Sequence, residues 1–328
     1  MQEALAFGPV PSRRLGRSLG INNVPPKTCT YSCVYCQLGS AVMATTTRRT
    51  FFSPADIRAA VMERLADVRV QGEEVDYLTF VPDGEPTLDA NLGQSIAAVI
   101  KVAVISNGSL TPDAPVRQEL STADWVSLKV DATTERIWRR VDRPHRDLRL
   151  GAIMQGMLAF RESFHGFLAT ETMLVRSLND AADELESIPD FLALLRPEMA
   201  YIAIPTRPPA AAWVQPAEER TIQRAYQVFR ARGVPAELLI GYEGDAFTAS
   251  GDARSDLLSI MAVHPMRSDA VEELLRQDGA DWGVVAELVG SGALVELEYE
   301  QERFYMRKLP SRSLAWPGRL GGTGTGPL

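Results

Sequence analysis

The sequence predicts an α/β fold, in which parallel strands form a partial (β/α)6 barrel, like an incomplete TIM barrel, followed by a small C-terminal domain. From residue 18 to about residue 245, short apolar runs typical of strands alternate with runs at helical spacing. Such alternation indicates parallel strands joined by crossover helices. From about residue 250 the alternation stops, and three short helical patterns precede two alternating strands.

The elements of the predicted barrel can be followed along the chain. Ser53 can cap a first helix that begins at Pro54, because serine accepts a bond from a free N–H and proline needs no acceptor there. Strands are predicted at 18–24, 75–81, 102–105, 125–130, 167–175, 200–204 and 236–241. Further helices are predicted at 91–100, 112–122, 150–160, 181–195 and 217–232. The barrel domain is therefore expected to span residues 1–245.

The predicted C-terminal domain spans residues 250–310. Its helices are expected at 256–263, 268–277 (with Ser268 as N-cap) and 281–291, and a hairpin at 294–299 and 303–308. Three helices and a hairpin resemble a winged helix, a fold that usually binds nucleic acid. Residues 252–308 hold twelve acidic and six basic side chains, whereas phosphate binding demands the opposite sign. We expect this domain to hold a protein or peptide or to pack on the barrel, and the tail, 311–328, to be disordered.

All three cysteines, Cys29, Cys33 and Cys36, lie in one stretch, 28–37. Three thiolates this close can converge on an iron–sulfur cluster, and a 4Fe–4S cube normally takes four. The sequence has no fourth cysteine, so one iron would be open, as in catalytic rather than structural metal sites. The alternative is a structural zinc site, which needs a fourth ligand, but all three histidines lie more than a hundred residues away.

This spacing, with Tyr35 before the third cysteine, resembles the signature of the radical S-adenosylmethionine (radical SAM) superfamily. The resemblance implies that SAM chelates the open iron of a 4Fe–4S cluster. The cluster would pass one electron, supplied by a donor such as flavodoxin or ferredoxin, to the sulfonium and release a 5′-deoxyadenosyl radical. The run 8–39 also resembles uncharacterised bacterial and archaeal proteins grouped with tRNA wyosine-base synthases, whose cysteines are spaced differently.

Polar turns follow the second and third predicted strands, where barrel active sites lie. The run Gly84-Glu85-Pro86 resembles the superfamily's Gly-Gly-Glu-Pro motif, with an aspartate in place of the first glycine. The resemblance implies that this turn binds the SAM amino group, and a glutamate can accept a bond from an ammonium. Ser106 and Asn107 end the third strand, where the superfamily contacts the ribose and carboxylate of SAM. Alone, both runs could be ordinary turns.

Polar residues also alternate along the fourth and fifth strands. Lys129 and Asp131 share a face, and we expect that face inside the barrel, because helices covering the outside would bury the charges. The alternative is a structural ion pair at the barrel mouth. On the fifth strand we expect the even-numbered residues to face inward. Thr172 would then face SAM or substrate, and Arg176 would bind the SAM carboxylate.

A basic run at 139–149 contains five arginines. It follows the fourth strand, so we expect it near the barrel mouth, where Arg143 and Arg146 would bind an anionic substrate. The alternative is a solvated surface, the usual place of charge runs. The N-terminal arginines that could add to this basic patch are Arg13, Arg14 and Arg17.

Together these features predict a radical SAM enzyme acting on an anionic small molecule or a peptide. RNA-base modification of the wyosine kind is one alternative, and a non-catalytic, metal-bound winged-helix regulator is another. The net charge of −8 does not favour nucleic acid as a partner. No stretch of 18 apolar residues predicts a membrane span, and the N-terminus does not look like a signal peptide. We therefore expect a cytoplasmic protein.

Overall fold

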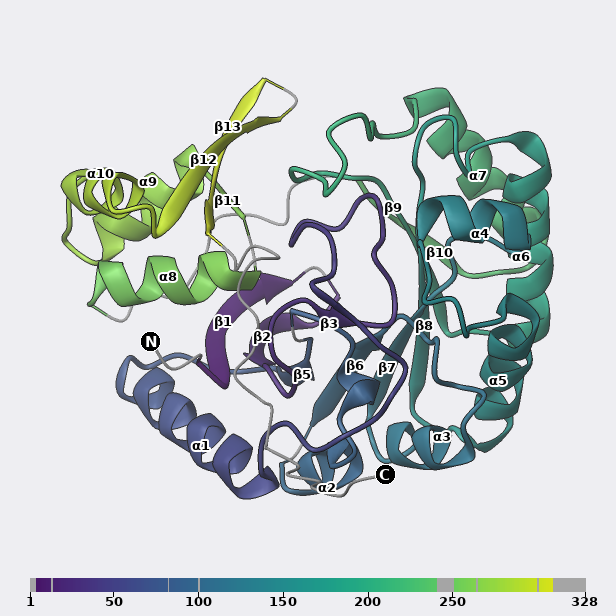
Figure 1. The fold of residues 1–328 in the computed structure, drawn as a ribbon, viewed down its shortest axis with the longest axis horizontal. Helices are drawn as coiled ribbons and strands as arrows, with labels where there is room; N and C mark the ends of the chain where they lie inside the picture. Colours follow the sequence, from purple (N-terminus) through teal and green to yellow (C-terminus); the bar gives the residue numbers. More distant parts are fainter. Residues whose placement is uncertain are drawn as a thin grey trace, which may run out of the picture.

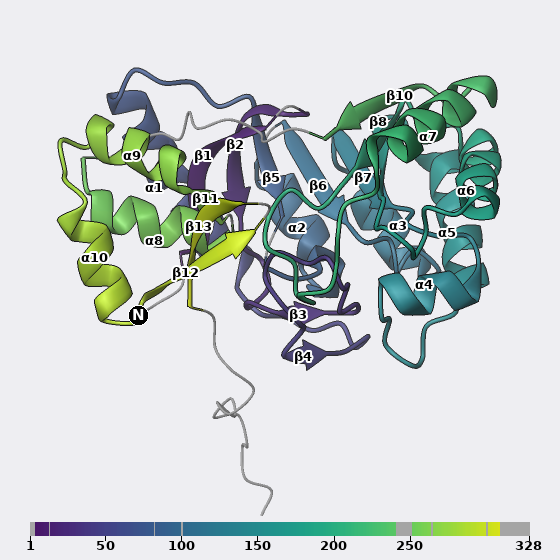
Figure 2. The same cartoon turned by 90° about the horizontal axis from the view of Figure 1, so that it is seen from above.

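The computed structural model describes residues 4–12, 14–81, 83–99, 101–240, 251–263, 265–299 and 301–308. Its centre is an eight-stranded sheet in the order β1-β2-β5-β6-β7-β8-β9-β10. The sheet is curled into a half-barrel, and helices cover its outer face (Figures 1 and 2). The strands of this sheet are β1 (Ala6–Ser12), β2 (Gly16–Ile21), β5 (Tyr77–Phe80), β6 (Val102–Ser106), β7 (Trp125–Lys129), β8 (Phe167–Met173), β9 (Met199–Ala203) and β10 (Ala236–Leu239).

In this order each strand from β2 onward is parallel to the one that follows it, which confirms the predicted partial barrel. The helices around it are α1 (Pro54–Val70), the 3-10 helix η1 (Pro86–Leu88), α2 (Leu92–Ala97), α3 (Ala114–Leu120), α4 (Glu135–Val141), α5 (Leu150–Ser163), α6 (Ala182–Leu195) and α7 (Glu219–Ala231). Ser53 caps α1 as predicted, and its Oγ accepts a bond of 3.0 Å from the backbone N–H of Asp56. The short helix α4 falls within a segment for which no helix was predicted.

The hairpin of β1 and β2 is the main addition to the predicted barrel. β1 pairs antiparallel with β2 and forms one edge of the sheet. β1 was not predicted from the sequence because it contains Pro9 and Pro11. Proline cannot donate to a ladder of backbone hydrogen bonds and is found mainly in edge strands. The turn after β1 carries Leu15, which is 3% exposed and packs inside the curled sheet with Trp125 and Tyr201.

The last described part of the chain forms its own buried cluster, which includes Leu257, Val271 and Leu288. Its elements are α8 (Ala253–Val263), β11 (Met266–Arg267), α9 (Ser268–Gln277), α10 (Gly283–Gly290), β12 (Leu294–Tyr299) and β13 (Glu302–Arg307). The three helices and the hairpin lie where they were predicted, and β11 completes a sheet in the order β11-β13-β12. That this unit is a winged helix stays a prediction. The tail 311–328 lies outside the described residues.

The C-terminal unit packs against the N-terminal edge of the half-barrel, where α8 contacts β1 (Figures 1 and 2). The hydroxyl of Tyr299, at the end of β12, donates a bond of 3.2 Å to the carbonyl of Pro205. The N-cap of α9 is Arg267, so the prediction of Ser268 as cap was wrong by one residue. Among the described helices, none is long and apolar enough to cross a membrane.

Candidate active site

The cysteine loop, residues 28–37, follows β2 and is held from behind by the segment after α4. The backbone N–H groups of Ser32 and Val34 donate to the carbonyls of Asp142 (3.0 Å) and Val141 (2.9 Å). In return, the N–H of His145 donates to the carbonyl of Thr30 over 2.8 Å. The short strand β3 (Thr28–Cys29) also pairs with β4 (Met43–Ala44). These backbone bonds fix the loop at the carboxyl end of the strands.

The three cysteines are free and half-buried. The Sγ of Cys29 accepts from the N–H of Tyr31 at 3.4 Å, and the Sγ of Cys33 lies 3.4 Å from a carboxyl oxygen of Asp142. Burial raises the pKa of the Cys29 thiol to about 12, and it raises the pKa of Cys33 and of Cys36 as well. A metal that replaces the thiol proton would convert them to thiolates.

This donor set fits an iron–sulfur cluster. It consists of three soft sulfur donors on one loop, the ligand type that such clusters take. Within the described part of the chain, no three His, Cys, Asp or Glu side chains are grouped to hold a single metal ion. A cluster does not require such a group, because each thiolate binds a different iron. Cys29, Cys33 and Cys36 are therefore the residues that would hold the cluster.

The Gly84-Glu85-Pro86 turn packs directly on the start of the cysteine loop. The N–H of Glu85 donates to the carbonyl of Thr28 at 3.0 Å, and a Cβ added to Gly84 would lie 2.1 Å from that same oxygen. Pro86 is buried and begins η1. Glycine is required here by close approach of two backbones. The turn thus lies beside the first cysteine.

The carboxylate of Glu85 is 1% exposed and has four internal donors. One oxygen accepts from the N–H of Thr87 (3.1 Å), from its hydroxyl (2.6 Å) and from Ser106 Oγ (2.7 Å), and the other accepts from the N–H of Asn107 (2.8 Å). The carboxylate ties the turn after β5 to the turn after β6. That the Gly84-Glu85-Pro86 turn also receives the ammonium of SAM stays a prediction.

Asn107 connects this pair of turns to the cysteine loop. Its side-chain amide donates to Thr30 Oγ1 at 2.7 Å and lies 3.6 Å from the Sγ of Cys29. The hydroxyl of Ser106 is directed to Glu85. The structure therefore brings the predicted residues Glu85, Ser106 and Asn107 together beside the first cysteine.

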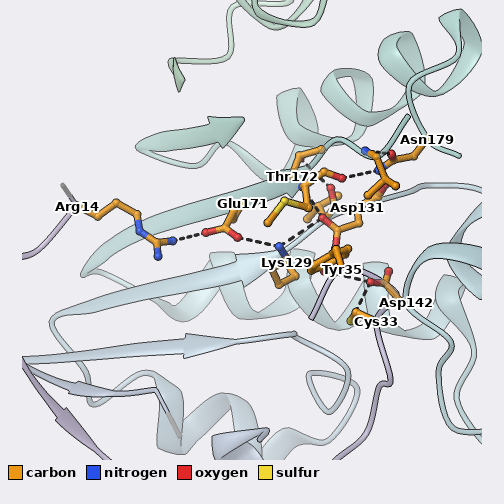
Figure 3. Close-up of polar contacts among 12 residues, drawn as sticks. Arg14, Cys33, Tyr35, Lys129, Asp131, Asp142, Glu171, Thr172 and Asn179 are labelled. Carbon is orange, nitrogen blue, oxygen red and sulfur yellow. Dashed lines mark hydrogen bonds and ion pairs between the residues drawn. The ribbon is translucent and has the colours of Figure 1, made fainter. Parts of the chain in front are cut away.

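A second polar network lies inside the half-barrel and contains the predicted pair Lys129 and Asp131 (Figure 3). The Nζ of Lys129 lies 2.8 Å from Glu171 Oε1, 3.6 Å from Asp131 Oδ1 and 4.8 Å from the ring centre of Tyr35. Burial alone would lower the pKa of Lys129, but the carboxylates of Asp131 and Glu171 raise it above its usual value. Lys129 is therefore a fixed cation.

Tyr35 joins this network to the cysteine loop (Figure 3). Its hydroxyl donates to Asp131 and lies 3.4 Å from the carboxyl of Asp142, which also contacts Cys33. Asp131 accepts a further bond of 2.7 Å from the N–H of Met173. Burial, with Asp131 as a smaller cause, raises the pKa of Asp142 well above its usual range. Asp142 was not predicted from the sequence.

The predicted inner face of the fifth barrel strand was wrong. In the register of β7 and β8, Lys129 pairs with Glu171, so the odd-numbered residues of β8 face inward. Thr172 lies on the opposite face, where its hydroxyl donates to the carbonyl of Val130 at 2.8 Å. Arg176 is exposed, and its guanidinium donates to the carbonyl of Pro216 over 3.1 Å. Glu171 takes the place expected for Thr172.

The arginine run does not line the interior of the half-barrel either. Arg143 is exposed, and the side chain of Arg146 is 90% exposed, with Asp147 at 3.8 Å. Neither is among the described residues around the cavity. After α4 the backbone supports the cysteine loop and the Asp142 side chain faces it, whereas the side chains of Arg143 and Arg146 face solvent, so neither arginine reaches the cavity.

The half-barrel encloses a cavity of about 340 Å³. Tyr35 and Cys36 line its side toward the cysteine loop, and strand residues such as Thr79 and Ile105 line its wall. Its charged lining residues in the described part of the chain are Arg14, Asp83, Lys129, Glu171 and Arg207. Lys129 was placed inside the barrel because a charged side chain should not face the covering helices, and the same reasoning applies to Glu171. Arg14 reaches the cavity through the β1–β2 hairpin, which was not predicted from the sequence.

The sequence of this chain is similar to those of a known protein family. The model of the Radical SAM superfamily matches residues 23–191. A UPF0026 protein of Methanocaldococcus jannaschii is 42% identical over 314 residues, which cover 94% of this chain and 97% of that protein. A UPF0026 protein of Synechocystis is 36% identical over 208 residues, covering 62% of this chain and 76% of the relative.

Solved structures resemble the fold. A radical SAM methyltransferase from Sphaerobacter thermophilus superposes with a TM-score of 0.53 at 16% identity, over 68% of this chain and 66% of its own. SuiB from Streptococcus suis superposes with a TM-score of 0.50 at 11% identity, over 74% of this chain and 56% of its own. At such identities the likeness concerns the fold alone.

Proposed function

The chain belongs to the radical SAM superfamily and is an enzyme of that class, and from this premise we propose the details of its site. A 4Fe–4S cluster is held by Cys29, Cys33 and Cys36, and SAM lies between the cluster and the cavity. The substrate is a small anionic molecule or a short peptide that enters the cavity. The observation that carries the proposal is the position of the cysteine loop, whose residues Tyr35 and Cys36 line the cavity.

When bound, the cluster would supply the electron that splits SAM into methionine and a 5′-deoxyadenosyl radical. The chain's own residues position the reactants. The backbone of Gly84-Glu85-Pro86 and the amide of Asn107 lie beside Cys29, where they can orient the amino acid part of SAM. Lys129, fixed by two carboxylates, offers a cation for the SAM carboxylate. Asp131 accepts a hydrogen bond from Tyr35 and so holds the cysteine loop in a fixed position relative to the barrel.

The cavity favours a small substrate over an extended nucleic acid. Its described charged lining contains both signs, whereas a polyanion calls for a continuous basic surface. The C-terminal unit, with twelve acidic and six basic residues between 252 and 308, would repel one. RNA-base modification of the wyosine kind is therefore the less favoured alternative. Membership of an enzyme superfamily likewise argues against a purely regulatory role.

The proposal is tested by anaerobic reconstitution. We expect about four irons and four sulfides per chain, and 5′-deoxyadenosine only when both SAM and a reductant are present. Replacing Cys29, Cys33 or Cys36 by Ala should abolish both the cluster and the formation of 5′-deoxyadenosine. Thr47→Ala changes an exposed residue after the cysteine loop and serves as the control that keeps cluster and activity. Stoichiometric zinc without iron in anaerobically purified protein would rule the proposal out.

A further inference from the structure

The turn between β1 and β2 enters the half-barrel and forms part of the cavity lining. Leu15 is 3% exposed and packs against Trp125, Tyr201 and Leu239, which come from β7, β9 and β10. A hairpin at one edge of the sheet is thereby anchored to strands at its other side. The turn is held at a fixed depth, and Arg14, next to the anchor, is held with it.

Arg14 lies over one aromatic ring and against one carboxylate. Its Cζ is 5.8 Å from the ring centre of Tyr201, and its Nη1 pairs with a carboxylate oxygen of Glu171. The side chains of Arg14 and Glu171 are each 13% exposed. Burial alone would raise the pKa of Glu171, but Lys129 and Arg14 lower it to about 2. The guanidinium is therefore a positioned cation at the wall of the cavity.

The charges inside the half-barrel alternate along a row (Figure 3). Arg14 pairs with Glu171, Glu171 with Lys129, and Lys129 with Asp131, which binds Tyr35 of the cysteine loop. The row therefore begins with a cation and ends with an anion beside the loop. SAM would occupy the end near the loop. The opposite end, at Arg14, is left for the substrate.

The surroundings of Arg14 limit the chemistry of such a substrate. The lining of the cavity also includes apolar residues of the hairpin, Phe7 and Val10, and Leu239 of β10. A volume of about 340 Å³ must also admit part of SAM, so the substrate portion is small. A guanidinium presents five N–H donors in a plane and can bind two carboxylates. Because Arg14 shares its charge with Glu171, a monoanion fits this place better than a phosphate dianion.

We infer that Arg14 binds the carboxylate of a small substrate with a short apolar part, and that the β1–β2 turn determines substrate specificity. The inference rests on the proposed function, because it assigns to the substrate the end of the cavity that SAM would leave open. Residues 4–21 lie outside the span 23–191 that matches the superfamily. The β1–β2 turn is therefore not part of the region that matches the superfamily as a whole.

The test is ligand-observed NMR on the reconstituted, SAM-loaded protein, with butyrate, butyramide and inorganic phosphate as probes. We expect butyrate to bind at least about tenfold more tightly than the neutral butyramide, which lacks the charge. Phosphate should bind more weakly than butyrate. In Arg14→Gln the affinity for butyrate should fall by about ten- to hundredfold, and Arg14→Lys should restore part of it, because the charge returns without the planar fork.

The matched control is Arg224→Gln, which removes an exposed arginine paired with Glu186 at 3.8 Å on the outer helices. It should bind butyrate as the wild type does. Equal binding of butyrate and butyramide to the wild type, preference for phosphate, or unchanged butyrate binding in Arg14→Gln would each overturn the inference. If Arg14→Gln does not fold, the wild-type comparison and Arg14→Lys still decide. SAM cleavage is measured in parallel: its absence in the wild type refutes the proposed function, whereas cleavage without carboxylate preference refutes this inference alone.

Discussion

The number of hydrogen-bond donors around a buried carboxylate decides its role, and Glu85 shows this at the scale of single residues. Its charge and its place in a motif indicate an acceptor for SAM, and the structure shows that it also accepts bonds from four internal donors. A buried carboxylate with such partners is a positioning group. It fixes Asn107, whose amide reaches the first cysteine. The sequence identified the residue as part of the site, and only the structure shows which internal groups it binds.

Glu171 shows the opposite case, since its role follows from a rule that the sequence supports. It is the only charged residue in β8, and a charge facing the helices would be buried without compensation. Threonine can take that outer face, because its hydroxyl bonds to a backbone carbonyl, as in Thr172. Charge is therefore a better guide to the inner face of a barrel strand than polarity in general.

The lowered pKa of Glu171 predicts a specific dependence of stability on pH. The folded state holds this carboxyl at a pKa of about 2, below its ordinary value of 4.5. The folded state therefore favours the ionised form, and the stabilisation is complete above pH 4.5 and lost as the pH falls toward 2. We expect Glu171→Gln to lower the free energy of unfolding by about 3 kcal/mol at neutral pH. The difference from the wild type should shrink as the pH falls through this window, as measured by denaturant unfolding.

An exposed glutamate provides the control for this prediction. The pKa of Glu273 is also lowered to about 2, by hydrogen bonds from Arg276 and Gln277, but the pair lies on the surface of α9. Solvent and salt screen such a pair. Glu273→Gln should therefore have little effect, and none at high salt. A larger effect for Glu273→Gln than for Glu171→Gln would contradict the assignment of Glu171 to the interior.

At the scale of elements, the cysteine loop depends on segments that are distant in sequence. The segment after α4 supports one side through backbone bonds to Ser32 and Val34. The long connection after β9 supports it as well, since the N–H of Ala211 donates to the carbonyl of Val34 at 3.0 Å and Arg207 donates to Gln37 at 3.3 Å. These bonds restrict the backbone of the loop that carries the cysteines.

Gly84 offers a test of how closely the Gly-Glu-Pro turn and the loop must fit. Gly84→Ala would place a Cβ 2.1 Å from the backbone oxygen of Thr28, and moving the Thr28 backbone would shift the neighbouring Cys29. We expect the unfolding free energy to fall by about 1–3 kcal/mol, and iron incorporation to fall with it. Unfolding by denaturant and iron content after reconstitution measure these effects.

The matched control is Gly151→Ala in α5, where an added Cβ meets nothing within 4 Å. Alanine is the better helix former, so this variant should be neutral or more stable by up to about 1 kcal/mol. Iron incorporation should not change. Equal behaviour of the two variants would show that the contact between Gly84 and Thr28 is not needed to form the site.

At the scale of the whole molecule, the C-terminal unit lies against the edge strand β1 and contacts the cavity rim through Tyr299 and Pro205. Covering an edge strand protects it from pairing with other chains. The same contact places an acidic unit beside Pro205, which lines the cavity. Its surface is therefore suited to a cationic or neutral partner rather than to nucleic acid.

This charge distribution predicts that the full-length protein does not bind duplex DNA tightly at physiological salt. Residues 252–308 carry twelve acidic and six basic side chains, and the chain as a whole has a net charge of −8. Binding to phosphates depends on releasing counterions to basic residues. A gel-shift assay with duplex DNA and with tRNA measures it. Submicromolar binding to either that is lost on deleting residues 250–310 would contradict the prediction and show that the C-terminal unit binds the substrate.

The sequence by itself determined the features that depend on neighbouring residues: the cysteine triad, the alternation of strands and helices, the Ser53 cap, and the inward pair Lys129 and Asp131. These features follow from residue spacing and from the free-energy cost of burying charge, and both can be judged from residues that are close in the sequence. Only the tertiary structure decided which distant groups meet. The register of β7 and β8 brought Glu171 to Lys129, four internal donors occupied Glu85, and a proline-containing edge hairpin carried Arg14 across the barrel interior. Such pairings depend on how strands separated by many residues are aligned, and no local pattern specifies that alignment.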